Sequence, residues 1–191
     1  MADLVADAHA AAPCVLVVMG VSGSGKSTIA AMLAQRLQWT YEDGDWFHPK
    51  SNVEKMHHGE PLTDEDRWPW LRAIAAWIDD TLKAGNHGIV ACSALKRSYR
   101  DILVGDRRNA RLVFLKGERD LIARRVAARD DHFMPASLLD SQFAALEVPA
   151  PDEHPIVVSI APHPRQIVDA IVRKLDIGPT TAAASEPVAA R

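Results

Sequence analysis

The stretch GVSGSGKS, residues 20–27, restricts what this chain can fold into more than any other feature. It matches the pattern G-x-x-x-x-G-K-[ST], and it lies between the apolar run CVLVVMG and a segment with helical periodicity. Glycines in such a turn let backbone amides point at phosphate oxygens, and the start of the following helix adds partial positive charge. The stretch predicts a phosphate-binding loop, against the alternative of a plain glycine-rich turn.

Each residue of this loop is a candidate for binding a nucleotide. Lys26 is the candidate for bridging the β and γ phosphates, and the Ser27 hydroxyl is the candidate ligand for Mg²⁺. The pattern leaves the recipient of the phosphoryl group open, because kinases, GTPases, motors and regulatory ATPases share it. The chain has no N-K-x-D stretch for guanine, which disfavours a GTPase. The candidate residues for ATP in the loop are Gly20, Val21, Ser22, Gly23, Ser24, Gly25, Lys26, Ser27 and Thr28.

Short apolar runs alternate with helical patterns along the chain. The runs at 14–20, 88–93, 111–117 and 155–160 are β-branched and almost continuously apolar, as strands buried on both faces are, and 39–43 is a weaker strand. Helical faces carry Ile29, Leu33 and Leu37 in one segment and Leu71, Ile74, Ile78 and Leu82 in another. Strands separated by helices predict the α/β class: a three-layer α/β/α P-loop NTPase fold with a parallel sheet and a mobile lid.

Length and charge set further bounds. The 191 residues predict one domain, over 13–177, between disordered ends at 1–12 and 178–191. A net charge of −3 disfavours nucleic acid as a partner. No apolar run approaches the roughly 20 residues of a membrane span, and Asp3 and Asp7 are unlike a secretory signal, so we expect no membrane association and a cytoplasmic location. Cys14 and Cys92 are expected to be packed thiols.

The stretch YEDGDWFHPK, residues 41–50, places Asp43 and Asp45 around Gly44. By itself it could be an Asx-type turn. A classical Walker B strand would end in Asp, whereas GIVACS ends in Cys92 and Ser93. Asp43 is therefore the nearest candidate for the second acid at Mg²⁺, and Asp45 could orient the hydroxyl group of an acceptor.

Basic residues that a small-molecule kinase would need follow in order. Arg67 could pair with an anionic part of a substrate, against the alternative of a solvated helix face. Lys96 and Arg100 lie at the start of a helix after a strand, which is the usual ligand edge of a parallel sheet. Arg125 and Arg129 are four residues apart and face one way.

Other polar clusters fit structural roles better. The acids Asp64, Glu65 and Asp66 follow Thr63 and suit a helix N-terminus, although Pro69 obscures where the helix starts. His57 and His58, before Gly59, are read as an exposed helix end and not as metal ligands.

Four stretches, in this order and spacing, resemble the small single-domain P-loop gluconokinases: GVSGSGKS, DGDWFHPKSNVEKMHHGEPLTDEDRWPWL, CSALKRSYRD and SQFAALEVP. The resemblance covers about residues 13–176, and its middle stretches are far more specific than the loop. It implies a shikimate kinase-like fold, ATP and Mg²⁺ as cofactors, and transfer of the γ-phosphate to the 6-hydroxyl of D-gluconate. It also implies a homodimer.

The resemblance assigns roles residue by residue. Asp43 would lie near Mg²⁺ through water, Asp45 against the attacking hydroxyl, and Arg67 on the gluconate carboxylate. Arg125 would lie over adenine, and Arg129 would reach the phosphates when a lid at about 130–137 closes. A polyol pocket would be completed by His48, Lys96, Arg100 and Gln142. The alternatives are another small acceptor on the same fold, such as shikimate, another sugar acid or a nucleoside monophosphate, and a nucleotide-binding regulator without an acceptor.

Overall fold

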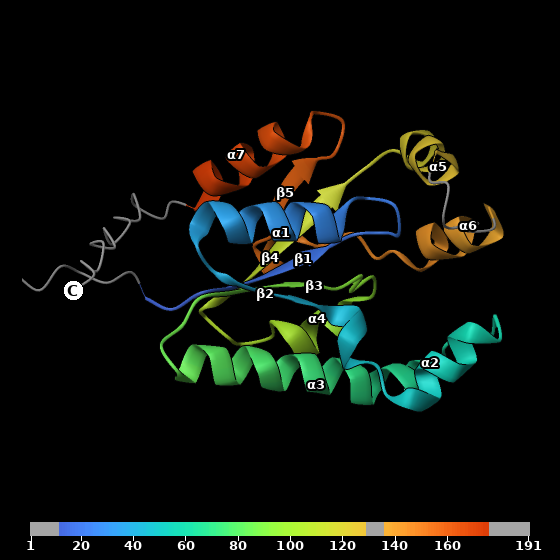
Figure 1. Cartoon of the computed structure of the whole chain (residues 1–191), viewed down its shortest axis with the longest axis horizontal. Helices are drawn as coiled ribbons and strands as arrows, with labels where there is room; N and C mark the ends of the chain where they lie inside the picture. The colour runs from blue at the N-terminus through green and yellow to red at the C-terminus, as the bar shows by residue number, and fades with distance from the viewer. Residues whose placement is uncertain (1–11, 129–135, 176–191) are drawn as a thin grey trace, which may run out of the picture.

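The computed structural model describes residues 12–128 and 136–175 (Figure 1). All of the predicted disordered ends except residue 12, together with Arg129 and most of the predicted lid, lie outside the described residues. The elements are β1 (Val15–Met19), α1 (Lys26–Leu37), β2 (Thr40–Asp43), the 3₁₀ turn η1 (Gly44–Phe47), α2 (Lys50–His57), α3 (Asp64–Lys83), β3 (Gly88–Ala91), α4 (Arg97–Leu103), β4 (Ala110–Lys116), α5 (Arg119–Ala127), α6 (Ala136–Ala145), η2 (Pro151–Glu153), β5 (Ile156–Ser159) and α7 (Pro164–Leu175).

One sheet of five strands runs through the molecule in the order β2-β3-β1-β4-β5, and every neighbouring pair is parallel. All five predicted strands are present, which confirms the α/β class and the parallel sheet. The central strand β1 is fully buried, as its unbroken apolar sequence predicts.

Helices cover both faces of the sheet (Figure 1). Helices α1 and α7 pack together on one face, and α3 and α4 pack together on the other. Strand β1 supplies both cores by alternation: Leu16 and Val18 join the core under α1 and α7, whereas Val15, Val17 and Met19 join the core under α3 and α4. The three-layer α/β/α arrangement is therefore confirmed.

The start of α3 follows the predicted capping chemistry. The Thr63 hydroxyl accepts from the Asp66 amide, and the Asp66 carboxylate accepts from the Thr63 amide, which completes a capping box. Pro69 lies inside the helix, because α3 begins at Asp64. His57 and His58 are both exposed at the end of α2, as predicted.

The expectation for the two cysteines also holds. Cys14 and Cys92 are free thiols, and Cys92 is buried, where burial raises its pKa to about 12. In the part of the chain that the structure describes, no helix is both long and apolar enough to cross a membrane.

Because the strands are parallel, their carboxyl ends meet at one edge of the sheet, where ligands bind in open α/β folds. The loop after β1, the acids after β2 and the loop between β3 and α4 all lie at this edge. In Figure 1 the helices α2, α5 and α6 gather at the same end of the molecule as the start of α1.

Candidate active site

The predicted phosphate-binding loop has the backbone that a phosphate cradle needs. Gly20, Gly23 and Gly25 have φ values of 148°, 80° and 92°, which residues with a side chain rarely adopt. At Gly23 a Cβ atom would lie 2.5 Å from Val126 Cγ2, so there is also no room for one. The N-terminus of α1 opens directly from this loop at Lys26.

The side chains of Ser24 and Lys26 suit an anionic ligand. The Ser24 hydroxyl is buried without a hydrogen-bond partner among the described residues, which is costly unless a ligand or water satisfies it. The Lys26 ammonium group donates to the carbonyl of Val21 at 3.2 Å, which folds it back over the loop. The loop therefore fits the phosphate groups of a nucleotide.

The predicted metal ligands Ser27 and Asp43 meet at this edge. The Ser27 hydroxyl donates to Asp43 Oδ2 at 2.9 Å, and the Tyr41 hydroxyl donates to the same oxygen at 3.0 Å. The described residues contain no group of three or more His, Cys, Asp or Glu side chains able to hold an ion. A hydroxyl and one carboxylate are the protein ligands that Mg²⁺ takes when substrate phosphates complete its shell, so this pair fits that ion.

Asp45 lies beside this pair. Its backbone amide donates to Asp43 Oδ1 at 3.1 Å, so the two carboxylates share one short turn. Burial and the negative charge of Asp43 raise the pKa of Asp45, while Lys26 lowers it. A carboxylate with a raised pKa is a better proton acceptor than an ordinary aspartate.

Gly44 separates the two acids because only glycine fits there. A Cβ atom on Gly44 would lie 2.4 Å from the carbonyl oxygen of Ala91 in the neighbouring strand β3. The indole Nε1 of the buried Trp70 donates to the Gly44 carbonyl at 2.6 Å. The turn is therefore fixed from both sides. The Asx-type hydrogen bond that Asp43 accepts from the Asp45 amide is part of the site.

His48 follows the acids and is held by packing. Its ring stacks on Trp70 with 4.3 Å between ring centroids, and its Nδ1 lies 3.4 Å from the Asn52 amide nitrogen. Asn52 is itself buried and donates to the carbonyl of Asp66 at 2.8 Å. Burial and the nearby charge of Arg67 lower the pKa of His48 to about 4.

This low pKa predicts that the protein loses stability in mild acid. An unfolded histidine protonates near pH 6.5, whereas His48 in the fold stays neutral down to about pH 4, so the unfolded chain binds more protons between these values. The free energy of unfolding should therefore fall as the pH drops from 6.5 to 4. Urea unfolding of the wild type and of His48→Asn over this range measures the effect. The variant should lose less stability than the wild type, and parallel profiles would contradict the prediction.

Arg67, Lys96 and Tyr99 form a second polar group around Asp64. Lys96 Nζ lies 2.7 Å from Asp64 Oδ2, and the Tyr99 hydroxyl donates to Asp64 Oδ1 at 2.5 Å. The Arg67 guanidinium lies 6.0 Å from the centre of the Tyr99 ring and donates to the carbonyl of Leu62. Both basic side chains are only partly buried, and the charge of Lys96 is paired with that of Asp64.

Arg125 lies at a pocket on the other side of the loop. The pocket has a volume of about 250 Å³, and it is lined by Gly23, Ser24, Gly25, Thr28, Ile29, Arg125, Pro164 and Ile167. Arg125 is held by a hydrogen bond from Nη2 to the carbonyl of Ile160 at 2.7 Å. Arg125 and the apolar side chains of Ile29, Pro164 and Ile167 line this pocket next to the phosphate-binding loop, so it is a suitable place for a nucleobase.

Three residues expected at the polyol pocket have other partners, the first being Lys96, whose ammonium group is paired with Asp64. Gln142 lies on the phosphate-binding loop, where its Oε1 accepts from the Ser22 amide at 2.6 Å. Arg100 is only 2% exposed, and its guanidinium is bound to Glu153 and to three backbone carbonyls. These contacts correct the expectation for Arg100, because a side chain so enclosed supports the site from behind instead of lining it.

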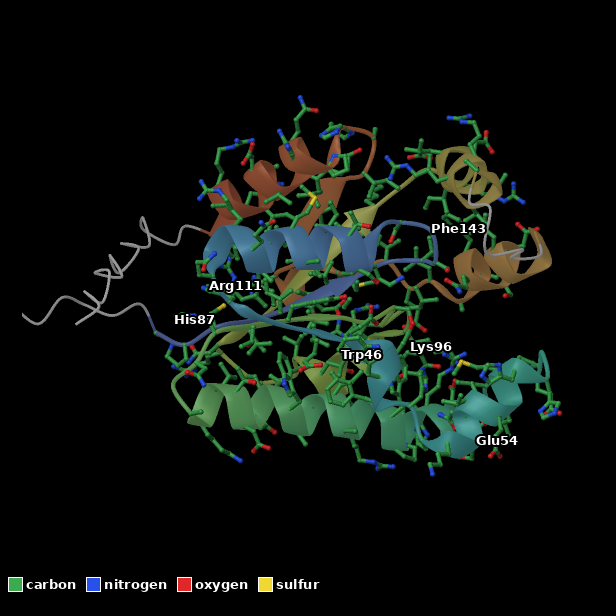
Figure 2. All side chains as sticks on the ribbon, viewed as in Figure 1. Trp46, Glu54, His87, Lys96, Arg111 and Phe143 are labelled. Atoms are coloured by element: carbon green, nitrogen blue, oxygen red, sulfur yellow. The ribbon has the colours of Figure 1, made fainter. Side chains whose placement is uncertain are left out.

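Several contributors to the site were not predicted. Tyr41 precedes Asp43 by two residues in β2, so alternation along the strand could have placed both on one face. Trp70, Tyr99 and Asp64 reach the site from helices, whereas the sequence predicts only a helix-terminal role for Asp64. Figure 2 shows that Lys96, from the loop before α4, and Phe143, from α6, lie at the same end of the molecule.

Comparisons with known proteins agree with this geometry. Residues 22–175 match the family model described as shikimate kinase. A gluconokinase of Gluconobacter oxydans (strain 621H) is 50% identical over 161 residues, which are 84% of this chain and 90% of the relative. A thermoresistant gluconokinase of Escherichia coli (strain K12) is 42% identical over 144 residues, 75% of this chain and 82% of the relative.

A solved structure extends the likeness to three dimensions. The crystal structure of a gluconokinase from Sinorhizobium meliloti 1021 superposes with a TM-score of 0.76 at 42% sequence identity. The superposition covers 86% of this chain and 92% of that chain. Sequence and fold therefore agree over nearly the whole length of the described residues.

Proposed function

This chain belongs to the gluconokinase family, and we propose that it transfers the γ-phosphoryl group of ATP to the 6-hydroxyl of D-gluconate, giving 6-phospho-D-gluconate and ADP. The observation that carries the mechanism is the hydrogen bond from Ser27 to Asp43, with Asp45 beside it at the phosphate-binding loop. This arrangement brings the phosphate-binding loop and the two acids to one edge of the sheet.

On the donor side, the amides from Gly23 to Thr28 would bind the phosphate groups, with Lys26 neutralising the charge that moves between the β and γ phosphates. Arg125 and the pocket below it would hold adenine. Arg129, which lies outside the described residues, stays a proposed contact to the phosphates.

Ser27 and Asp43 would hold Mg²⁺ together with the phosphates of ATP. When bound, this ion would neutralise phosphate charge and orient the γ-phosphoryl group. The Tyr41 hydroxyl would help to hold the Asp43 carboxylate in place, because it donates to Asp43 Oδ2.

On the acceptor side, Asp45 would take the proton of the attacking hydroxyl group. At the same time the oxygen of that hydroxyl group would bond to the γ-phosphorus, and the bond from the γ-phosphorus to the β-γ bridging oxygen would break. Arg67 would bind the gluconate carboxylate, where a guanidinium fork suits two oxygens. Neutral His48 and the Lys96 ammonium group would bind hydroxyl groups of the polyol chain.

A coupled assay of ADP release tests this function. The protein with MgATP is offered gluconate, other sugar acids, shikimate and nucleoside monophosphates, and gluconate should stimulate release most. If another acceptor alone stimulated ADP release, the protein would still be a kinase but with a different substrate. Release that no acceptor stimulates would refute the proposed kinase activity. The homodimer and the cytoplasmic location stay predictions, and sedimentation of the purified protein would test the first.

Arg67→Ala should raise the KM for gluconate by about tenfold or more, since a charged hydrogen-bonded pair is worth roughly 1.5–3 kcal/mol. The KM for ATP should change little, because Arg67 lies on the acceptor side. Steady-state kinetics against both substrates measures the split. Arg72→Ala, an exposed arginine one turn further along α3, is the matched control. An unchanged gluconate KM in Arg67→Ala would move the carboxylate site elsewhere.

A further inference from the structure

The stretch from Gln142 to Glu153 contacts both loops of the site. At its start, Gln142 Oε1 accepts from the Ser22 amide in the phosphate-binding loop at 2.6 Å. Further along, the Glu147 amide donates to the Leu95 carbonyl at 2.9 Å, and Glu147 Oε2 accepts from the Arg97 amide at 2.6 Å. One short piece of chain therefore touches the donor loop and the loop between β3 and α4.

Arg100 fixes the far end of this stretch. Its Nε and Nη2 donate to the two oxygens of Glu153 at 2.5 and 2.9 Å, and the side chains are only 2% and 9% exposed. Its Nη1 donates to the carbonyls of Ala94, Leu95 and Glu147. A buried charge pair with this many hydrogen bonds allows few other arrangements, because breaking it would leave an uncompensated charge.

The loop that Arg100 holds is one that needs support. Ala94 has a φ of 44°, which is unfavourable for a residue with a side chain, and such strain persists only where surrounding contacts enforce it. The preceding Ser93 carbonyl accepts from the Gly20 amide at 3.3 Å, so the loop also borders the phosphate-binding loop. Two residues after Ala94 comes Lys96, on the acceptor side of the site.

We propose that the stretch from Gln142 to Glu153 is a positioning element that sets the donor loop against the acceptor side. Gln142 acts on the donor loop through Ser22, and Glu153 acts on the loop of Lys96 through Arg100. The Ser22 amide is committed to Gln142, so the phosphate cradle is formed by the amides that follow it. The inference rests on the proposed function, because it assumes that a phosphoryl group crosses between these two sides.

Two variants and their combination test the proposal. Gln142→Ala should raise the KM for ATP, and Glu153→Gln should raise the KM for gluconate, each on the order of tenfold. Both variants should also lower kcat by about tenfold or more, since a displacement of 1 Å can cost about 10²-fold in rate. Each variant should leave the KM for the other substrate within about twofold. Asp152→Asn, which removes the exposed partner of Arg97 on the same stretch, is the matched control and should behave like the wild type.

The double variant distinguishes positioning from simple stability. Distant sites that act independently give additive effects, so the two losses in kcat would multiply. If one element sets both loops, the loss in kcat of Gln142→Ala,Glu153→Gln should differ from that product by about threefold or more, while thermal stabilities add. Unchanged KM values in the folded single variants, or losses in kcat that multiply, would overturn the proposal.

Two further measurements keep the outcome decisive. Where Glu153→Gln does not fold, Glu147→Ala removes the exposed contact to Arg97 and should raise the gluconate KM in its place. Calorimetric binding of MgADP to Gln142→Ala needs no acceptor, and an affinity equal to that of the wild type would overturn the donor half of the proposal. A wild type that gluconate does not stimulate would refute the proposed function instead, with the MgADP measurement still valid.

Discussion

Asp45→Asn should lower kcat by about 10²–10⁴-fold, the range for loss of a general base, and leave the binding of MgATP intact. Asparagine keeps the size of the side chain and can still hydrogen-bond the acceptor, but it cannot take up a proton. Asp45 lies one residue after Gly44 and makes its backbone contact to Asp43 through its amide, so the substitution leaves that bond in place.

The pH profile adds a second readout for Asp45. Its pKa is raised by burial and by Asp43, so the acid limb of the wild-type profile should lie above the ordinary value of 3.8 and activity should fall as the pH drops through it. The residual activity of Asp45→Asn should lack this limb. Asp80→Asn, which changes an exposed acid near the C-terminal end of α3, is the matched control. Near-normal turnover of Asp45→Asn would show that another group accepts the proton.

Gly44→Ala should damage both the fold and the catalysis, although it adds a single methyl group. Its Cβ atom would lie 2.4 Å from the Ala91 carbonyl oxygen, so the turn must move away from β3. We expect a loss of about 1–3 kcal/mol in the free energy of unfolding, as for other overpacked sites, and a fall in kcat of about 10²-fold from displacement of the acids.

Urea unfolding and steady-state kinetics measure the two effects of Gly44→Ala. The control is Gly85→Ala, where no atom lies within 4 Å of the added methyl group and the φ of 73° alone costs stability. This control should be destabilised but fully active once folded. An activity of Gly44→Ala equal to that of the wild type would mean that catalysis does not depend on the close placement of the two acids.

Much of the donor side could be predicted from the sequence because its determinants are local. The phosphate-binding loop, the strand before it and the helix after it are contiguous, and their glycines have the φ values that the pattern requires. The pairing of Asp43 with Ser27 followed from an argument of elimination, since β3 ends without an acid. Parallel strands then brought both to one edge of the sheet.

The acceptor side could be predicted only in part because its contacts join distant residues. Arg100 reads as a basic residue near a ligand edge, and its burial depends on Glu153, 53 residues further along the chain. Gln142 bonds to Ser22 across 120 residues, and no periodicity encodes such a contact. The indole of Trp70 that holds Gly44 looks like any other apolar residue of its helix.

The order of the strands predicts that the two sides of the site differ in rigidity. In the part of the chain that the structure describes, the donor loop follows the central strand β1, which has strands on both sides, whereas the two acids lie at the end of β2, which pairs only with β3 at the edge of the sheet. Edge elements open locally at lower free energy than central ones, so the amides of Thr40–Asp43 should exchange with deuterium faster than those of Val15–Met19. On the proposed function, the phosphates of the nucleotide would lie against the centre of the sheet, and the acceptor would approach its edge.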